Sequence, residues 1–310
     1  MRGMFEVITY QFTQRPRDVA VMLWAMKLMR FICIALLAYA LNACTAISLI
    51  YDSAPKLAQF ELDGYIDMSA AQEQRVAPLI DAAFAWHRKT ELPRYATTLR
   101  TLAERVQKPL STADVGQVFQ TVQGFGRTAG IYLLPQQAAL ALDLKDSNLR
   151  ALQKKYAKDN LKFTKDWLRL GTDAAQTKRF EDTLKWLERV YGDFDDAQLA
   201  SLRAVSDKRP LNMALVLEIR QARQAEILAT LTDIVRTQHS AKTAETQLVA
   251  LVSRLEKLDN PAHQAFVNSS NEALHALIAH ATQIATPAQK ATARGKLLGW
   301  ADDAIKLSSR

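Results

Sequence analysis

The chain has 310 residues, of which 49% are hydrophobic, and carries 40 Lys and Arg against 32 Asp and Glu. This hydrophobic fraction is sufficient for a packed core and excludes a generally disordered protein. Only 10 Gly, 9 Pro and 2 Cys are present, which favours helices over a turn-rich β fold and excludes a disulfide scaffold and a cysteine-based zinc site.

The segment 26–43 has the features of a bacterial export signal. Lys27 and Arg30 form a short basic region, and an apolar run follows from Phe31 to Ala43. The run ends in Leu-Asn-Ala-Cys44, which resembles a lipobox, the motif whose cysteine receives a diacylglycerol and becomes the new N-terminus. We therefore predict a signal peptide at 26–43 and lipidation at Cys44. Residues 1–25 are too long for a basic region, and we interpret them as a start-site artefact.

An uncleaved membrane anchor is the alternative, because no charged residue lies between Phe31 and Tyr51 and about 20 apolar residues can span a bilayer. Both interpretations export the rest of the chain. Thr45 follows the cysteine in place of the aspartate that retains lipoproteins at the inner membrane. We therefore expect an outer-membrane lipid anchor on Cys44, with the protein facing the periplasm of the cell envelope.

The charge of the exported part argues against nucleic acid as a partner. Five of the 40 basic and two of the 32 acidic residues precede Cys44, which leaves a net charge of +5. These charges are interspersed along the sequence, a pattern typical of solvated helix faces.

From Cys44 onwards, the pattern predicts a lipidated N-terminal leader at 44–67 and a helical domain at 68–310, with a subdomain break near 210 left open. Apolar residues recur at spacings of three and four, as they do in helices that bury one face. The expected helices begin near residues 69, 92, 111, 149, 180, 195, 211, 261 and 287. Because this part contains no alternating run of β-branched residues, we predict an all-α, elongated multi-helix bundle.

Three expected helix starts share one form, a capping residue with Gln three positions later: Ser69, Asp195 and Thr286. This spacing is that of a capping box, which satisfies free backbone groups at a helix N-terminus. It also resembles the short repeated motif of small helical periplasmic chaperones. The simpler interpretation is that each box serves only its own helix.

The densest group of chemically active side chains lies at an expected corner between two helices: Trp86, His87, Arg88, Glu91 and Tyr95. One interpretation is a polar pocket at this corner. The other is that His87 and Tyr95 satisfy backbone groups exposed where Pro93 ends a helix.

A second candidate group, Asn160, Arg220 and Arg223, interrupts two apolar helix stripes. Polar residues in such positions must find partners, so they line an inner polar site or fix the register of neighbouring helices.

Motifs of known enzymes and metal sites are missing from the sequence. His275 and His280 are five residues apart, which places them on different helix faces, and no HExxH or GxSxG motif occurs. No cofactor and no metal is expected. A cell-wall hydrolase with a carboxylate acid or base is the alternative to a non-enzymatic role, with Glu61, Asp63, Asp67 and Glu91 as its candidates.

Several strings resemble a family of uncharacterised proteobacterial helical lipoproteins, a domain of unknown function. They lie at 62–67, 86–96, 156–160, 179–198 and 220–231. The likeness is collinear, includes the lipobox and covers nearly the whole exported part. It implies an all-helical, envelope-anchored protein and provides no catalytic residues. We therefore expect a non-enzymatic scaffold or protein-binding module, with an envelope protein or an unfolded client as its partner.

Overall fold

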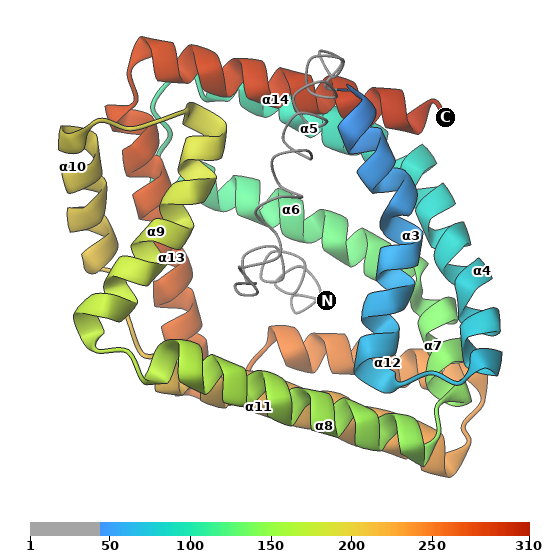
Figure 1. The fold of residues 1–310 in the computed structure, drawn as a ribbon. Helices are drawn as coiled ribbons and strands as arrows, with labels where there is room; N and C mark the ends of the chain where they lie inside the picture. Colours follow the sequence, from blue (N-terminus) through green and yellow to red (C-terminus); the bar gives the residue numbers. More distant parts are fainter. Residues whose placement is uncertain (1–43) are drawn as a thin grey trace, which may run out of the picture. The chain divides into compact units, whose positions relative to one another are not determined.

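The structure, a computed structural model, describes residues 44–310, which form α-helices and two short π-helical segments with no strand among them (Figure 1). The all-α prediction is confirmed. The first half contains α3 (Cys44–Ile66), α4 (Ala70–Trp86), η1 (His87–Glu91), α5 (Leu92–Arg105), α6 (Thr112–Tyr132), α7 (Leu134–Asp143), α8 (Asp146–Phe163) and η2 (Thr164–Leu168). The second half contains α9 (Thr172–Tyr191), α10 (Asp196–Asp207), α11 (Met213–Thr237), α12 (Ala241–Glu256), α13 (Pro261–Ile284) and α14 (Pro287–Ser308).

The contacts divide the chain into two compact units, Met1–Pro55 and Lys56–Arg310, with the boundary inside α3. In the smaller unit, Cys44–Pro55 is helical, and the predicted signal peptide and start-site artefact lie outside the described residues. The segment interpreted as a leader is therefore a helix. The last residues of α3, Leu62, Tyr65 and Ile66, belong to the larger unit and join one of its hydrophobic clusters. In residues 44–310, no helix combines the length and apolar character that a membrane crossing needs.

Three clusters of buried apolar side chains form the core of the larger unit. The first joins α5, α6, α9, α10, α13 and α14, and it includes the fully buried Leu202 and Leu277. The second joins α7, α11 and α12 around Ile234, and the third joins the end of α3 to α4, α8 and α11. The sequence spacing did not indicate α7 and α12, although both contribute to the second cluster.

The loop between α3 and α4 meets the loop between α7 and α8 at what we call the first junction, formed by Ser69, Gln72, Lys145 and Asn148. Ser69 caps α4 as predicted: its hydroxyl accepts from the Gln72 N–H at 3.4 Å, and Gln72 Oε1 accepts from the Ser69 N–H at 3.0 Å. At the N-terminus of α8 one half of such a box is present, because the Lys145 N–H donates to Asn148 Oδ1 at 2.9 Å.

The two amide side chains of the first junction also bridge the two loops. Gln72 Nε2 donates to Asn148 Oδ1 at 3.0 Å and to the Asp143 carbonyl at 2.8 Å. In return, Asn148 Nδ2 donates to the carbonyls of Ile66 at 2.8 Å and Asp67 at 3.1 Å. Each amide therefore caps its own helix and also binds the loop that precedes the other helix.

The second junction, formed by Asp195, Gln198, Thr286 and Gln289, repeats this arrangement between α10 and α14. Both capping boxes predicted there are present. Gln198 Nε2 donates to Gln289 Oε1 at 2.8 Å, and Gln289 Nε2 donates to Gln198 Oε1 at 3.0 Å. The boxes therefore do more than serve their own helices.

The second junction also reaches across to the opposite loop. Gln198 Nε2 donates to the Ile284 carbonyl at 2.9 Å, and Gln289 Nε2 donates to the Asp193 carbonyl at 2.7 Å. Each acceptor lies two residues before the capping residue of the opposite helix, as Asp143 and Asp67 do at the first junction. The two junctions therefore share one hydrogen-bond pattern.

Candidate functional site

The predicted corner lies where the chain passes from α4 to α5. There is no loop at this point, because η1 continues the helical backbone and the Leu92 N–H donates to the His87 carbonyl five residues earlier. Pro93 follows in the first turn of α5 and has no N–H to donate. The wider π turn absorbs this mismatch. The expectation that Pro93 ends the helix and leaves exposed backbone groups is wrong.

Two of the predicted corner residues are in contact. His87 Nε2 lies 3.2 Å from the Tyr95 hydroxyl, and the two rings meet edge to face. Burial lowers the pKa of His87, and the negative charge of Glu91 opposes this shift. Trp86 instead stacks on Tyr132 of α6, with ring centroids 4.0 Å apart, while Arg88 is half-buried on η1. Aromatic packing thus accounts for much of the corner.

Glu91 is the most unusual group of the corner, because it is fully buried. Its Oε1 accepts from Arg94 Nη1 at 2.7 Å, and its Oε2 has no hydrogen-bond partner in the described part of the chain. A buried carboxylate of this kind is out of reach of a polymeric substrate. Among the other acid candidates, Asp63 accepts the Met68 N–H at 2.7 Å at the end of α3. These two carboxylates therefore have structural contacts.

The second predicted group is partly brought together between α8 and α11. Arg220 Nε donates to Asn160 Oδ1 at 2.9 Å, and Asn160 Nδ2 donates to Gln224 Oε1 at 2.7 Å. Arg220 also lies 4.0 Å from Asp159, and Arg223 comes from the same helix, α11. These bonds tie the two helices together, which suits the register interpretation. No metal-binding group of His, Cys, Asp or Glu is found in residues 44–310.

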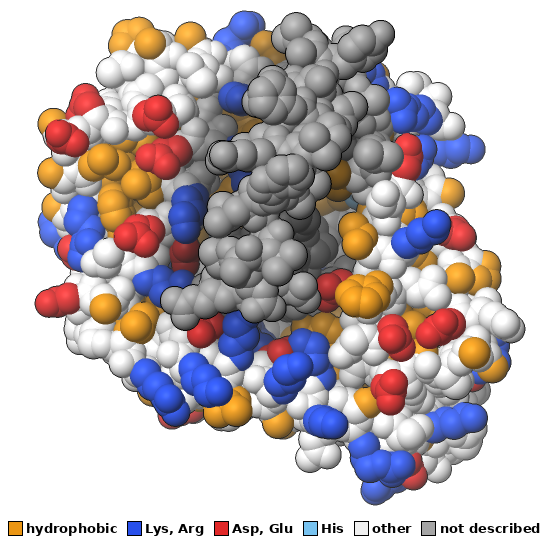
Figure 2. All heavy atoms as spheres, viewed as in Figure 1, with side chains coloured by type: hydrophobic (Ala, Val, Ile, Leu, Met, Phe, Trp, Pro, Cys, Tyr) orange, Lys and Arg blue, Asp and Glu red, His pale blue; other side chains and the backbone are white. Residues whose placement is uncertain are grey.

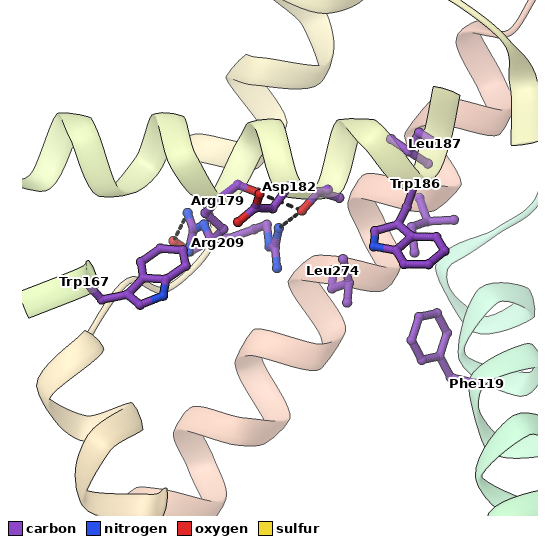
Figure 3. A pocket seen from close by; sticks show the side chains of 10 residues that line it. Phe119, Trp167, Arg179, Asp182, Trp186, Leu187, Arg209 and Leu274 are labelled. Carbon is purple, nitrogen blue, oxygen red and sulfur yellow. Dashed lines mark hydrogen bonds between the residues drawn. The ribbon is translucent and has the colours of Figure 1, made fainter. Parts of the chain in front are cut away.

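A pocket of about 390 Å³, lined by no residue of either predicted group, lies between α6, α9, η2 and α13 (Figure 3). Its volume falls within the range of about 300–1,000 Å³ that is typical of small-molecule sites. Its apolar walls are Phe119, Trp167, Trp186, Leu187, Leu274 and Ile278, and its polar lining residues are Arg179, Asp182, Thr183 and Arg209. In Figure 3 the two arginines lie between Trp167 on one side and Trp186 with Phe119 on the other.

The two arginines are held by backbone and hydroxyl groups. Arg179 Nη1 donates to the Pro210 carbonyl at 2.6 Å, and its Nη2 donates to the Ser206 carbonyl at 2.9 Å and the Arg209 carbonyl at 3.2 Å. Arg209 reaches back to α9, where its Nη1 donates to Thr183 Oγ1 at 3.3 Å. Arg179 therefore fixes the loop that carries Arg209.

Both arginines are poorly solvated. Burial lowers the pKa of Arg209 to about 10, with a further contribution from the positive charge of Arg179. Burial also lowers the pKa of Arg179, against the opposing effect of Asp207. The Nε atoms of both residues are buried without a hydrogen-bond partner in the described part of the chain. Both remain cationic at neutral pH.

A row of basic side chains runs along α8 and η2 towards the pocket. Exposed Lys or Arg residues recur every three or four positions at 150, 154, 158, 162, 165 and 169. Figure 2 shows basic side chains gathered along the lower edge of the view, where Figure 1 places α8. As expected, the charges are interspersed along the sequence. Residues four apart share a helix face, however, so the basic side chains of α8 gather on one side of the helix. The row ends beside Trp167, which lines the pocket.

No pattern in the sequence directly indicates this pocket. Trp167 belongs to an apolar helix stripe and reads as a core residue, although it lines an open space. Arg179 and Arg209 stand on different segments, and only the fold brings them together. The one available signal was that Arg179 opens a string already noted for its resemblance to a family, residues 179–198.

Comparison with known proteins places the chain in a family without assigning an activity. No curated protein and no solved structure matches the chain significantly. A family model does match, over residues 64–264, which include the first junction, the corner and both pocket arginines. The chain therefore belongs to DUF6279, a family of unknown function.

Proposed function

We propose that this protein is a non-enzymatic lipoprotein of the bacterial cell envelope whose helical domain acts as a binding module. In this proposal, Cys44 carries the lipid and holds the protein at the outer membrane, facing the periplasm. The export signal at 26–43 and the lipobox-like end of that signal support the anchor. The apolar pocket bounded by α6, α9, η2 and α13 supports the binding role, and this observation carries the proposal.

The lining of the pocket suits binding better than hydrolysis. A glycosidase of the common type needs two carboxyl groups facing each other across the scissile bond. Asp182 is the one acidic residue that lines this pocket, and it forms ion pairs with Lys178 at 3.7 Å and Lys185 at 3.4 Å. The rest of the lining consists of aromatic, aliphatic, hydroxyl and arginine side chains, which provide recognition without an acid–base pair.

Exposed apolar side chains near the pocket favour a protein partner or an unfolded client as a further occupant of the same module. Trp186 is 50% exposed, and Leu168 and Leu170, which follow Trp167, are 37% and 36% exposed. Large apolar side chains grouped at a surface are typical of interaction sites. An aggregation-suppression assay with a denatured model client tests this version, and absence of any effect at a stoichiometric ratio would remove it.

The anchor is tested by changing Cys44→Ser and following metabolic incorporation of radiolabelled palmitate and membrane fractionation. Loss of the label and release from the outer-membrane fraction are expected, because several acyl chains on one cysteine anchor a protein far more firmly than a single chain. Unchanged labelling and unchanged fractionation would contradict the lipoprotein assignment.

The hydrolase alternative is tested separately by incubating the folded protein with purified peptidoglycan and analysing the glycan by mass spectrometry. We expect no new fragments. Release of cleaved muropeptides that is abolished by Glu61→Gln or Asp67→Asn would instead support a carboxylate-based enzyme.

A further inference from the structure

The pocket contains a positive charge that its neighbours do not balance. Asp182 pairs with Lys178 and Lys185, and Asp207 pairs with Arg203 through two oxygens at 2.8 Å. In the described residues, neither Arg179 nor Arg209 forms a salt bridge with a carboxylate. Two guanidinium groups thus line one pocket with no carboxylate bonded to either of them, and Asp207, whose charge acts on Arg179, is itself paired with Arg203.

Arg209 is the group best placed to meet an anion. A guanidinium has five N–H donors, and in the described chain Arg209 uses one of them, on Thr183 Oγ1 at 3.3 Å. Arg179 is largely occupied by the carbonyls of residues 206, 209 and 210, so it positions the loop and adds positive charge. An arginine fixed at its base with free donors is suited to bidentate binding of a carboxylate or phosphate.

The remaining walls select the body of such a ligand. Trp167 and Trp186 flank the arginines (Figure 3). Leu274 and Ile278 of α13 add aliphatic surface to the lining. Binding of a hydrocarbon chain would remove the apolar surface of these walls from water, which is favourable, whereas an inorganic anion would leave that surface exposed to water. The basic row along α8 and η2 ends at Trp167 and raises the local concentration of anions near the pocket.

We propose that this pocket binds a single-chain amphiphilic anion, with its carboxylate or phosphate on Arg209 and its hydrocarbon body between the two indoles. The inference rests on the proposed binding function and names the chemistry of the ligand. A free fatty acid and a lipid phosphate both have this chemistry, and the head group distinguishes them.

The test uses the purified full chain and three probes with the same chain length: octanoate, octyl phosphate and 1-octanol. Isothermal titration calorimetry gives the affinities, and the ligand-dependent change in tryptophan fluorescence, to which Trp167 and Trp186 contribute, reports occupancy of the pocket. Octanoate or octyl phosphate is expected to bind at least about tenfold more tightly than octanol, because a charge-assisted hydrogen bond distinguishes them. The tighter of the two anions identifies the head group.

Three variants isolate the arginine. Arg209→Gln keeps a polar side chain but removes the charge, so it should reduce the affinity for the anion about tenfold to a hundredfold and leave octanol binding unchanged. Arg209→Lys keeps the charge but lacks the planar guanidinium, so its affinity for the anion should lie between those of the unchanged protein and Arg209→Gln. Arg236→Gln, exposed in the last turn of α11 and outside the basic row, is the matched control for loss of one positive charge and should change anion affinity less than twofold.

The outcomes separate this inference from the proposed function. If octanol binds as tightly as both anions, or if Arg209→Gln behaves like Arg236→Gln while circular dichroism shows both variants folded, the anion assignment is wrong and apolar ligand binding remains. If none of the three probes binds to the folded chain, the ligand class is wrong, whereas palmitate labelling and client binding still decide the proposed function.

Discussion

The first and second junctions share one hydrogen-bond pattern but differ in burial and in backbone conformation. At the first junction, Gln72 and Asn148 are each 2% exposed, so water cannot replace a lost bond. At the second, Gln198 is 8% exposed and Gln289 is only partly buried. The same hydrogen-bond pattern should therefore contribute more to stability where solvent is excluded, because an unsatisfied buried group is more costly than an exposed one.

The largest effect is expected from Gln72→Ala at the first junction. This change removes the donor to the Asp143 carbonyl and to Asn148 Oδ1 and leaves a small void, which should lower the free energy of unfolding by about 3 kcal/mol. Urea denaturation followed by circular dichroism measures the change. Gln74→Ala, exposed on the same helix, is the matched control and should change stability by less than about 0.5 kcal/mol.

The next largest loss of stability is expected from Gly192→Ala. Gly192 lies just before the second junction. Gly192 has φ of 79° and ψ of −172°, a region that residues with a side chain rarely adopt. A Cβ there would lie 3.8 Å from Thr292, an ordinary contact, so the penalty of about 2 kcal/mol comes from the backbone alone.

The first junction has Asp67 near the corresponding position, with φ of 51°. Aspartate tolerates the left-handed region, so Asp67→Gly should change the free energy of unfolding by about 1 kcal/mol or less. Equal losses from Gly192→Ala and Asp67→Gly in the same denaturation experiment would mean that backbone strain does not distinguish the junctions.

A smaller effect is expected from Gln289→Ala at the second junction. The change removes the donor to the Asp193 carbonyl, but water reaches this site, so the loss should be about 1 kcal/mol. Comparison with Gln72→Ala under identical conditions tests the role of burial directly. A loss for Gln289→Ala equal to that for Gln72→Ala would show that solvent exclusion is not the difference.

The smallest effect is expected from the tyrosines that precede the two junctions, Tyr65 and Tyr191. Burial raises the pKa of each to about 12, and the charge of Asp159 adds to the shift at Tyr65. Because the unfolded value is near 10, stability from both tyrosines is full below pH 10 and is lost as the pH rises to 12.

Tyr65→Phe and Tyr191→Phe should each flatten the fall in unfolding free energy between pH 10 and 12. Denaturation curves at pH 8, 10 and 11 measure this slope. A slope that is unchanged in both variants would assign the alkaline loss to other groups, such as Tyr156, whose pKa burial also raises to about 12.

Much of the fold was predictable from spacing and caps, because an amphipathic helix and its capping box are local features. Ser69, Asp195 and Thr286 were identified as caps and are caps. The second function of their glutamines was not predictable from one helix alone, since it depends on a loop far along the chain. A clue lay beside the boxes: Tyr-x-Asp precedes both Met68-Ser69 and Phe194-Asp195.

The candidate site was less predictable than the fold. The contact between His87 and Tyr95 and the bond between Asn160 and Arg220 were anticipated as groupings, because each pair lies in a dense or conspicuous pattern. The pocket was missed because its arginines belong to α9 and to the loop after α10, and a lone arginine on a helix usually indicates a solvated face.

The span of each junction has a consequence for the order in which the molecule assembles. Gln72 and Asn148 are 76 residues apart, and Gln198 and Gln289 are 91 apart. Closing a loop of this length costs about 4 kcal/mol, more than one hydrogen bond returns, so we expect the helices and their apolar contacts to form before the amides meet. We therefore expect the hydrogen bonds of both junctions to form late in folding. During synthesis, which starts at the N-terminus, α4 stays without its partner at the first junction until α8 has been made.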